Sequence, residues 1–404
     1  MRPLAITGIG FVTPVGLDLA SFRAAFDDPA AARARAFAGP ITALPLEKLP
    51  GARVAEVSGF DASAHLGEKG LRNFDRLTKL LIVAAKRALE DAGIKIDGAF
   101  VGPLKPEQVG VCSSTAYGSL DSITELNLVA ELEDPRYINP ARFPNTVINA
   151  AAGYVSIWED LRAPNATVVD GNCGALDAVL TCETHLAHRR ADAFVVGGGD
   201  VLSEPLYVAF RMLDAVAEGD ACWEPASADS TGIRLGEGVA YLLVERRDEA
   251  VARGASVRAL IAGYGTAFEP PTNDALLLNA SPVAVSRAIR LALDDAGISA
   301  AQVDAVCSSC SGLARYDVAE LHAIEQVLGS DVAVAAPKAM WGEAFAGAPA
   351  MGMAAAACWV SADPARRARV GPLVQGRVKD DTKVVVVTAV GYYGNVSAVV
   401  IKRA

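Results

Sequence analysis

Two hydrophobic patterns alternate along the whole chain. Short apolar runs rich in β-branched residues, typical of strands buried on both faces, are separated by longer stretches in which apolar residues recur at helical spacing. The most regular of these stretches predicts a helix over residues 71–92, ended by Gly93. Strands and helices that alternate in this way predict an α/β protein whose sheets are parallel or mixed and covered by helices.

One helix-turn-strand unit occurs twice. Residues 85–94, followed by a strand at 109–114, are echoed by residues 289–298, followed by a strand at 303–309. Two copies at corresponding places predict a duplicated α/β unit.

The boundary between the two copies is expected between residues 246 and 257. We therefore predict an N-terminal half, residues 1–250, and a C-terminal half, residues 251–404. The length fits two such units, because a single core rarely grows beyond about 300 residues.

Three further segments carry a clear prediction. Residues 28–54, rich in alanine, proline and arginine, are expected to form an irregular surface excursion. The apolar run 344–360 is interrupted by glycines and a proline and is shorter than the roughly 20 clean apolar residues that span a bilayer, so it predicts a buried helix. Residues 383–390 and 396–402 predict a terminal hairpin.

Charge and cysteine content limit the possible functions. The net charge of −10 argues against nucleic-acid or anionic-membrane binding, since both depend on cationic surface. Seven scattered cysteines favour reducing surroundings. Cys307 and Cys310 form a CxxC, but no second pair or nearby histidine completes a metal site, so no metal is expected. Without a secretory pattern or a membrane span, the protein is expected to be cytoplasmic.

Residues 165–201 read as strand, helix and strand, with Cys173 at the start of the helix. Free backbone N–H groups and the positive end of the helix dipole favour a thiolate at such a position. Cys173 is therefore a candidate nucleophile. The alternative is a packed core residue, because free cysteine is among the most buried residue types.

Several motifs together resemble the β-ketoacyl synthase family of the thiolase superfamily, which includes the ketosynthase and chain-length-factor subunits of type II polyketide and fatty acid synthases. The resemblance spans nearly the whole chain. It rests on residues 6–16 (ITGIGFVTPVG), 143–146 (FPNT), 149–153 (NAAAG), 235–238 (LGEG), Asp317 with Glu320, and 338–342 (KAMWG).

This resemblance implies a thiolase-like fold, with two duplicated halves in an α/β/α/β/α five-layer sandwich that works as a dimer. It implies that Cys173 accepts an acyl group from the phosphopantetheine arm of an acyl carrier protein, with no other cofactor. In the family reaction a carrier-bound malonyl unit then loses carbon dioxide. Two neutral histidines donate hydrogen bonds to the thioester oxygen, where enolate charge develops.

The sequence departs from the family pattern at both histidines. Counting back from Asp317 and Glu320 places Ser309 at the first, and counting forward from Lys338 places Glu343 at the second. The family lysine that Lys338 matches sits beside the acid that Glu320 matches, so Asp317 and Glu320 are expected to support the site from behind.

A carboxylate at the second position is unfavourable for condensation. A negative charge about 4 Å from a developing enolate costs on the order of 4 kcal/mol at an effective dielectric near 20, or about a thousandfold in rate. Pairing of Lys338 with Glu343 would offset part of this cost. The alternative is that Ser309 and Glu343 are polar fillers of a silent site.

These departures leave hypotheses from different classes. In the first, the protein is a chain-length-factor-type partner of a complete ketosynthase in a type II polyketide or fatty-acid-like pathway and does not condense by itself; retention of Cys173 weighs against it. In the second, it is an acyltransferase or atypical condensing enzyme in which Cys173 is acylated and Glu343 acts as base. In the third, it is an ordinary condensing homodimer with substituted donors.

Other residues are assigned more loosely. Trp341 could narrow an acyl tunnel, and Tyr392 and Tyr393 lie where the family has a loop near the nucleophile, so gating and core packing both stay open. A basic helix face could meet an acidic carrier protein, although a solvated face is the commoner explanation. This face consists of Lys69, Arg72, Arg76 and Lys79.

Overall fold

A computed structural model describes residues 3–270 and 280–404. Its strands are β1 Leu4–Val12, β2 Lys95–Ile96, β3 Ala99–Phe100, β4 Val109–Ser114, β5 Asn165–Val168, β6 Ala193–Asp200, β7 Gly238–Arg246, β8 Ala259–Phe268, β9 Ala305–Cys307, β10 Ala333–Ala335, β11 Leu373–Gln375, β12 Val384–Val390 and β13 Asn395–Lys402. Its α-helices are α1 Leu19–Asp27, α2 Pro29–Ala38, α3 Ala62–Leu66, α4 Arg76–Asp91, α5 Leu120–Leu128, α6 Ala150–Glu159, α7 Gly174–Ala187, α8 Glu204–Met212, α9 Arg247–Ala252, α10 Pro282–Ala296, α11 Ala314–Leu328, α12 Lys338–Trp341 and α13 Gly347–Val360.

The two halves of the chain have the same sheet topology. In the first half the strands lie in the order β5-β4-β6-β7-β1, and in the second half in the order β10-β9-β12-β13-β8. In each half the first two pairings are parallel and the last two antiparallel. Residues 4–6 of β1 pair with residues 259–261 of β8, which joins the halves. The predicted duplication is therefore present in the hydrogen-bonding pattern.

The repeated helix packs unusually close to its sheet in both halves. A Cβ atom on Gly10 in β1 would lie 2.1 Å from the carbonyl oxygen of Ala84 in α4, and one on Gly265 in β8 would lie 2.2 Å from that of Ala288 in α10. Because glycine has no Cβ, each strand can touch the backbone of its helix. Ala84 and Ala288 occupy corresponding positions just before the two sequence copies.

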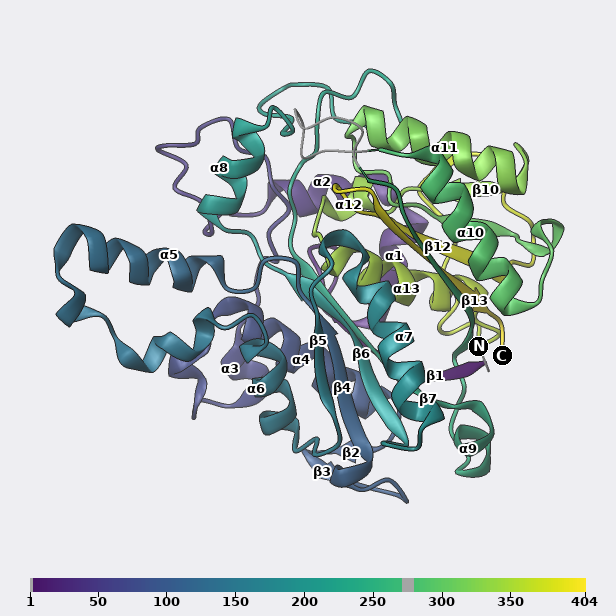
Figure 1. Ribbon diagram of the computed structural model, residues 1–404, viewed down its shortest axis with the longest axis horizontal. Coiled ribbons are helices and arrows are strands. Elements are labelled where there is room, and N and C mark those ends of the chain that lie inside the picture. Colours follow the sequence, from purple (N-terminus) through teal and green to yellow (C-terminus); the bar gives the residue numbers. More distant parts are fainter. Residues whose placement is uncertain (1–2, 271–279) are drawn as a thin grey trace.

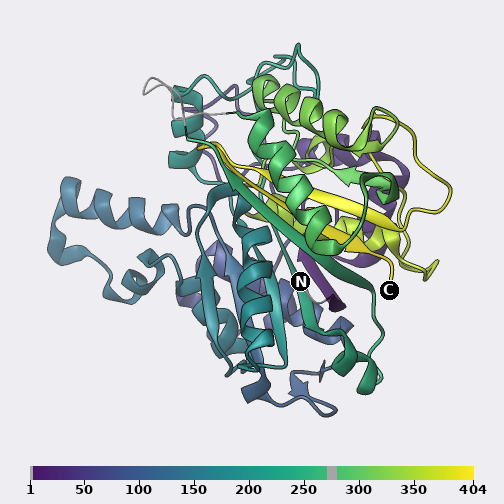
Figure 2. The ribbon, with the colours of Figure 1, turned by 45° about the vertical axis from the view of Figure 1, so that its right-hand side comes forward.

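The helices and sheets form layers (Figures 1 and 2). Helices α4 and α6 cover the outer face of the first half-sheet, and α10, with α11 beside it, covers the outer face of the second. Helices α7 and α13 lie between the two half-sheets and contact strands of both. This arrangement has the α/β layers that the sequence predicts.

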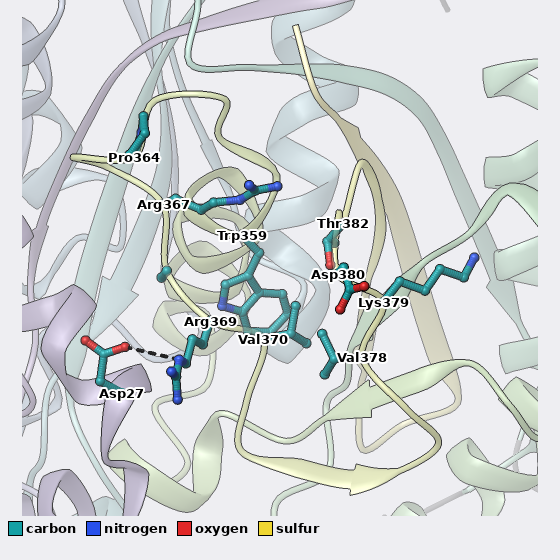
Figure 3. Close-up of a pocket in the computed structure, with 11 residues that line it drawn as sticks. Asp27, Trp359, Pro364, Arg367, Arg369, Val370, Val378, Lys379, Asp380 and Thr382 are labelled. Atoms are coloured by element: carbon teal, nitrogen blue, oxygen red, sulfur yellow. Dashed lines mark ion pairs between the residues drawn. The ribbon is translucent and has the colours of Figure 1, made fainter.

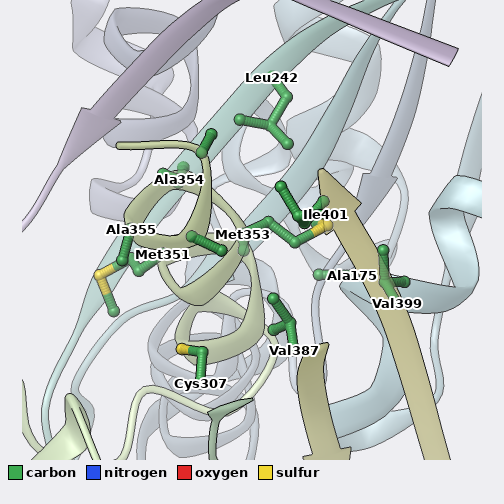
Figure 4. Packing of buried hydrophobic residues seen from close by; sticks show 14 of the residues in the cluster. Ala175, Leu242, Cys307, Met351, Met353, Ala354, Ala355, Val387, Val399 and Ile401 are labelled. Carbon is green, nitrogen blue, oxygen red and sulfur yellow. The ribbon is translucent and has the colours of Figure 1, made fainter. Parts of the chain in front are cut away.

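Helix α13 forms the centre of the molecule. Every residue from Gly347 to Val360 is buried, and its methionines and alanines pack against apolar side chains of both half-sheets, including Leu242 of β7 and Val387 of β12 (Figure 4). The predicted buried helix is confirmed, and so is the terminal hairpin of β12 and β13. Among the residues that the structure describes, no helix is long and apolar enough to cross a membrane.

Two predicted boundaries are wrong. The segment 28–54 is not wholly irregular, because Asp28 caps α2 by accepting a hydrogen bond from Ala31 N, and Pro29 fits its first turn. The helix expected from residue 71 begins at Arg76, because Asp75 caps it at that point, and Leu71–Asn73 form a separate 3-10 turn. Local capping therefore outweighed composition at α2 and hydrophobic periodicity at α4.

Candidate active site

Cys173 ends the short 3-10 turn Gly171–Cys173 that leads from β5 into α7. Its side chain is fully buried. The Sγ atom lies 3.3 Å from the carbonyl oxygen of Ala389 and 3.5 Å from that of Asn395, so the thiol donates towards the ends of β12 and β13. These contacts suit a protonated thiol in the core.

The surroundings of Cys173 disfavour its thiolate. Complete burial raises the pKa of the thiol well above its ordinary value, and the nearby carboxyl groups of Asp177 and Asp170 raise the pKa further. This result is the reverse of the shift expected from the helix dipole alone. Desolvation and two acidic neighbours outweigh the partial charge of one helix terminus.

Glu343 is the centre of a buried polar network. Its Oε2 accepts hydrogen bonds from Lys338 Nζ at 2.7 Å, Tyr392 OH at 3.0 Å and Asn172 Nδ2 at 3.4 Å. Its Oε1 accepts one from Phe345 N at 2.8 Å. The Glu343 side chain is 0% exposed, so this ion pair with Lys338 is almost completely removed from water. A buried charge persists only when it is paired and hydrogen-bonded in this way.

Ser309 lies in the same network. Its Oγ lies 3.2 Å from Lys338 Nζ and also accepts a hydrogen bond from Val390 N at 3.2 Å. Lys338 therefore bridges the two residues that the sequence places at the histidine positions. The structure brings Ser309, Glu343 and Lys338 together, whereas the thiol of Cys173 faces other partners.

Glu320 and Asp317 hold the loop that carries Ser309. Glu320 Oε1 accepts hydrogen bonds from Ser309 N at 2.8 Å and Thr388 Oγ1 at 2.5 Å. Asp317 accepts from Ser311 N at 2.9 Å and from Gly312 N at 2.8 Å. Burial raises the pKa of both acids. The hydrogen bonds fit the predicted supporting role, but Lys338 forms its ion pair with Glu343 and not with Glu320.

Asn172 is the residue that the sequence reasoning missed. Successive side chains of a 3-10 turn diverge by about 120°, so Asn172 and Cys173 leave the turn in different directions. The amide of Asn172 reaches Glu343, whereas the thiol of Cys173 faces the carbonyl groups of β12 and β13. No signal in the sequence indicates which of these two neighbours faces the network.

There is little space beside Ser309 and Lys338. A cavity lined by Ser309, Lys338, Trp341 and Thr388 has a volume of about 10 Å³, which is near the minimum for one water molecule. Tyr392 is buried, and its ring packs on Phe210 and Phe345. Tyr393 is 51% exposed and does not share this environment.

Trp341 points towards the N-terminal helices. Its ring stacks with Phe22 of α1 at a centroid distance of 6.1 Å and meets Phe26 edge-on at 6.3 Å. Its indole therefore packs an aromatic cluster, although one side borders the small cavity next to Ser309.

The basic residues predicted to form one helix face are separated. Lys69 and Arg72 precede α4, which begins at Arg76. Arg76 Nε lies 3.0 Å from Glu237 Oε2, and Glu237 is fully buried, so this arginine serves a structural ion pair. Lys69, Arg72 and Lys79 remain on the surface as candidates for contact with an acidic partner.

A larger cavity of about 720 Å³ lies at the other end of α13 (Figure 3). It is lined by Trp359 and by charged side chains that have partners of their own: Arg369 lies 3.7 Å from Asp27, and Lys379 lies 2.8 Å from Asp304. It shares no lining residue with the Glu343 network. Helix α13 is about 20 Å long, so this cavity is not part of the candidate site.

The side chains of the described residues offer no arrangement that suits a metal ion. Within residues 3–270 and 280–404, no group of three or more His, Cys, Asp or Glu side chains is arranged to hold one. Cys307 of the CxxC ends β9, within the strand predicted over residues 303–309.

Comparisons with known proteins agree with the architecture. The family models described as beta-ketoacyl synthase, N-terminal domain and C-terminal domain match residues 1–250 and 258–363. A 3-oxoacyl-acyl-carrier-protein synthase 2 of Coxiella burnetii is 30% identical over 362 residues, which cover 87% of this chain and 84% of that protein. The tetracenomycin polyketide synthase ketoacyl synthase beta subunit of Streptomyces glaucescens is 29% identical, with coverage of 88% and 84%.

A solved structure has the same fold. The ishigamide ketosynthase/chain length factor superposes with a TM-score of 0.83 at 24% identity and covers 100% of this chain and 99% of that one. The predicted thiolase-like fold is thereby confirmed.

Proposed function

Because this chain belongs to the β-ketoacyl synthase family, we propose that it is a non-condensing partner subunit of the chain-length-factor type, which pairs with a complete ketosynthase in a type II polyketide or fatty-acid-like pathway. Acyl chains would reach the pair on the phosphopantetheine arm of an acyl carrier protein. The names of the two relatives and of the solved structure are consistent with such a pathway.

The observation that carries this proposal is the direction of Asn172. Condensation needs a thiolate at the place that faces the two hydrogen-bond donors. Here the side chain that faces Glu343 is the amide of Asn172, and an amide offers no nucleophile. The thiol of Cys173 is turned away and protonated. Its retention therefore no longer weighs against a partner role.

Glu343 adds a second obstacle to condensation. Its oxygens already accept hydrogen bonds from Lys338, Tyr392, Asn172 and a backbone N–H. A carboxylate accepts but cannot donate while ionised, so it gives no stabilisation to an enolate. It would also have to break these bonds to act as a base for Cys173. The acyltransferase alternative thus lacks a base aimed at its nucleophile.

A partner surface is available at the edge of the first half-sheet. Strand β5 is the outermost strand there, so one of its edges has backbone groups open to pairing. The arm that includes α5 extends away from the body nearby (Figures 1 and 2). Exposed apolar side chains gather on this arm, on α6 and next to β5: Leu128, Leu132, Tyr137, Phe143, Val147, Ile157 and Val169. Exposed apolar surface on this scale is typical of a protein–protein interface.

The central test is made on purified protein with malonyl and acyl thioesters of an acyl carrier protein. We expect no release of carbon dioxide and no increase in the mass of the protein. With a complete ketosynthase added, we expect a stable mixed dimer whose chain elongation is unchanged by Cys173→Ala. Acylation of the isolated protein that Cys173→Ala abolishes would instead establish the acyltransferase reading. Carbon dioxide release by the isolated protein would establish a condensing enzyme.

The interface is tested by introducing a charge into its apolar surface. Val169→Asp should dissociate the mixed dimer in size-exclusion chromatography with light scattering. Val251→Asp is a matched control, since Val251 is similarly exposed but lies on α9, away from β5. If both variants dissociated the mixed dimer equally, or if neither did, the partner would bind at another surface.

A further inference from the structure

A third cavity, which plays no part in the proposed function, lies between α2 and α12. These helices pack against each other (Figure 1), and the cavity beside them has a volume of about 580 Å³. Volumes of this size are usual for small-molecule sites.

One wall of the cavity is apolar. Ala34 and Phe37 contribute from α2, Met340 from α12, and Pro372 from the segment before β11. Met340 is fully buried, so it packs beneath the surface of this wall. This wall could cover the body of an apolar ligand.

The lining also includes two arginines and one acid, Glu224, so its net charge is positive. Arg33 and Arg234 both line the cavity, and their guanidinium groups lie 4.4 Å and 5.3 Å from the ring of Trp223. The indole is held in place, because Trp223 Nε1 donates a hydrogen bond to Ser311 O at 2.9 Å. The two guanidinium groups are therefore positioned by stacking on one aromatic ring.

Only one of the two arginines is neutralised. Arg33 forms an ion pair of 2.8 Å with Glu224. For Arg234, no carboxylate of the described residues lies within ion-pair distance. Its Nη2 donates to the carbonyl oxygens of Gly219 at 3.1 Å and Ala221 at 3.5 Å, and its Nε has no hydrogen-bond partner in the described part of the chain. Burial lowers the pKa of Arg234, the like charges of Arg33 and Arg53 lower it further, and the more distant carboxylate of Asp220 opposes them. An anion would relieve this repulsion.

We propose that this cavity binds a small carboxylate with an apolar body, whose charged group pairs with Arg234 and whose chain lies along Phe37 and Pro372. A carboxylate oxygen accepts a charge-assisted hydrogen bond from arginine, and Nε and Nη1 of Arg234 are the donors left for it, because Nη2 already donates to two carbonyl oxygens. The apolar wall then removes the chain from water at about 25 cal/mol per Å².

Binding of a ligand in this cavity would affect the segment that carries Glu343. The backbone oxygen of Arg234 accepts a hydrogen bond from Glu343 N at 2.8 Å, and α12 begins with Lys338. A ligand held by Arg234 would therefore contact a residue that is hydrogen-bonded to the backbone of Glu343, and it would lie beside α12, which begins with Lys338. We expect slower amide exchange in residues 338–345 when the cavity is filled.

The test uses octanoate as the probe and the full-length protein. We expect saturable binding in calorimetric titration, little binding of uncharged octanamide, and slower exchange in residues 338–345. Arg234→Gln should weaken octanoate binding at least tenfold. Ala34→Trp, a substitution at an exposed helix position that fills the cavity, should do the same without removing any buried contact.

Arg35→Gln is the matched control, because it removes an equal charge from α2, beside the cavity, at a residue that does not line the cavity. It should leave the affinity unchanged. The proposal is overturned if octanoate does not bind saturably, if Arg35→Gln weakens binding as much as Arg234→Gln, or if inorganic phosphate binds as tightly as octanoate. The last outcome would show that the apolar wall plays no part.

Discussion

Asn172 and Cys173 are neighbours in the sequence, but they meet different parts of the molecule. One reaches the buried carboxylate of Glu343, and the other donates to the carbonyl groups of Ala389 and Asn395. The chemistry available at this site depends on that difference. A thiol that faces peptide carbonyls and carboxyl groups is a core residue, whereas an amide that faces Glu343 completes a closed polar network.

Chemical labelling separates these roles at the level of one residue. With the folded protein and iodoacetamide between about pH 7 and 9, we expect Cys222 to be alkylated and Cys173 to stay unmodified. Cys222 is exposed, while burial and nearby acids keep Cys173 in its thiol form. Mass spectrometry of peptides measures both sites, and unfolding in urea should expose both. Equal labelling rates in the folded protein would contradict the assignment.

Glu343 and Lys338 should behave as one unit. Glu343→Gln leaves the ammonium group of Lys338 buried without its ion-pair partner, so we expect the free energy of unfolding to fall by about 3 kcal/mol in urea titrations. Lys338→Met should cost a similar amount for the same reason. The double variant should lose clearly less than the sum of the single losses. Strict additivity would mean that the two groups do not interact.

At the scale of elements, close packing fixes the outer helices against the two half-sheets. The repeated helices α4 and α10 lie against glycines of β1 and β8, so any side chain there would meet helix backbone. The same contact occurs in both halves and sets the distance between helix layer and sheet.

Gly265→Ala tests this packing. The new Cβ would lie 2.2 Å from Ala288 O, so we expect a loss of more than about 2 kcal/mol in the free energy of unfolding. Gly10→Ala should cost a similar amount because its contact with Ala84 is equivalent. Gly153→Ala is the control: it lies within α6 with open space around it, so it should stabilise by up to about 1 kcal/mol. Equal effects at the three positions would contradict the packing argument.

At the scale of the whole molecule, polar contacts tie the middle layer to the second half-sheet. Asp177 of α7 accepts hydrogen bonds from Tyr264 OH in β8 at 2.6 Å and Ser397 Oγ in β13 at 2.5 Å. The pKa of Asp177 is raised from 3.8 to about 7; burial is the largest cause, and the neighbouring Asp170 is the next largest. Global stability should therefore depend on the protonation of this buried carboxyl.

The sign of that dependence follows from linkage. Between its ordinary pKa of 3.8 and about 7, the folded protein binds a proton at Asp177 that the unfolded chain has released. This group's contribution to stability is therefore complete below the unfolded pKa and is lost as the pH rises through the folded pKa. Urea midpoints across this range should fall less steeply with pH in Asp177→Asn than in the unchanged protein. Parallel curves would show that Asp177 does not titrate in this way.

The layered α/β architecture follows directly from hydrophobic pattern. Buried strands, the repeated unit at 85–94 and 289–298, the terminal hairpin and the buried helix at 344–360 each depend on local periodicity and composition, which the sequence states plainly. The starts of α2 and α4 were harder to predict, because one capping aspartate determines each of them. The grouping of Ser309, Glu343 and Lys338 could be predicted only through the resemblance to a family.

The hydrophobic pattern and the repeated unit are enough to predict a duplicated α/β protein, and the spacing of the family motifs predicts that Ser309 and Glu343 stand at the two histidine positions. Only the folded chain shows that the side chain of Asn172, and not that of Cys173, faces Glu343. It also shows that Lys338 forms an ion pair with Glu343 and that Arg76 forms one with Glu237. The physical reason is distance along the chain. Periodicity and helix dipoles are local, whereas desolvation and charge pairing come from segments that only folding brings together.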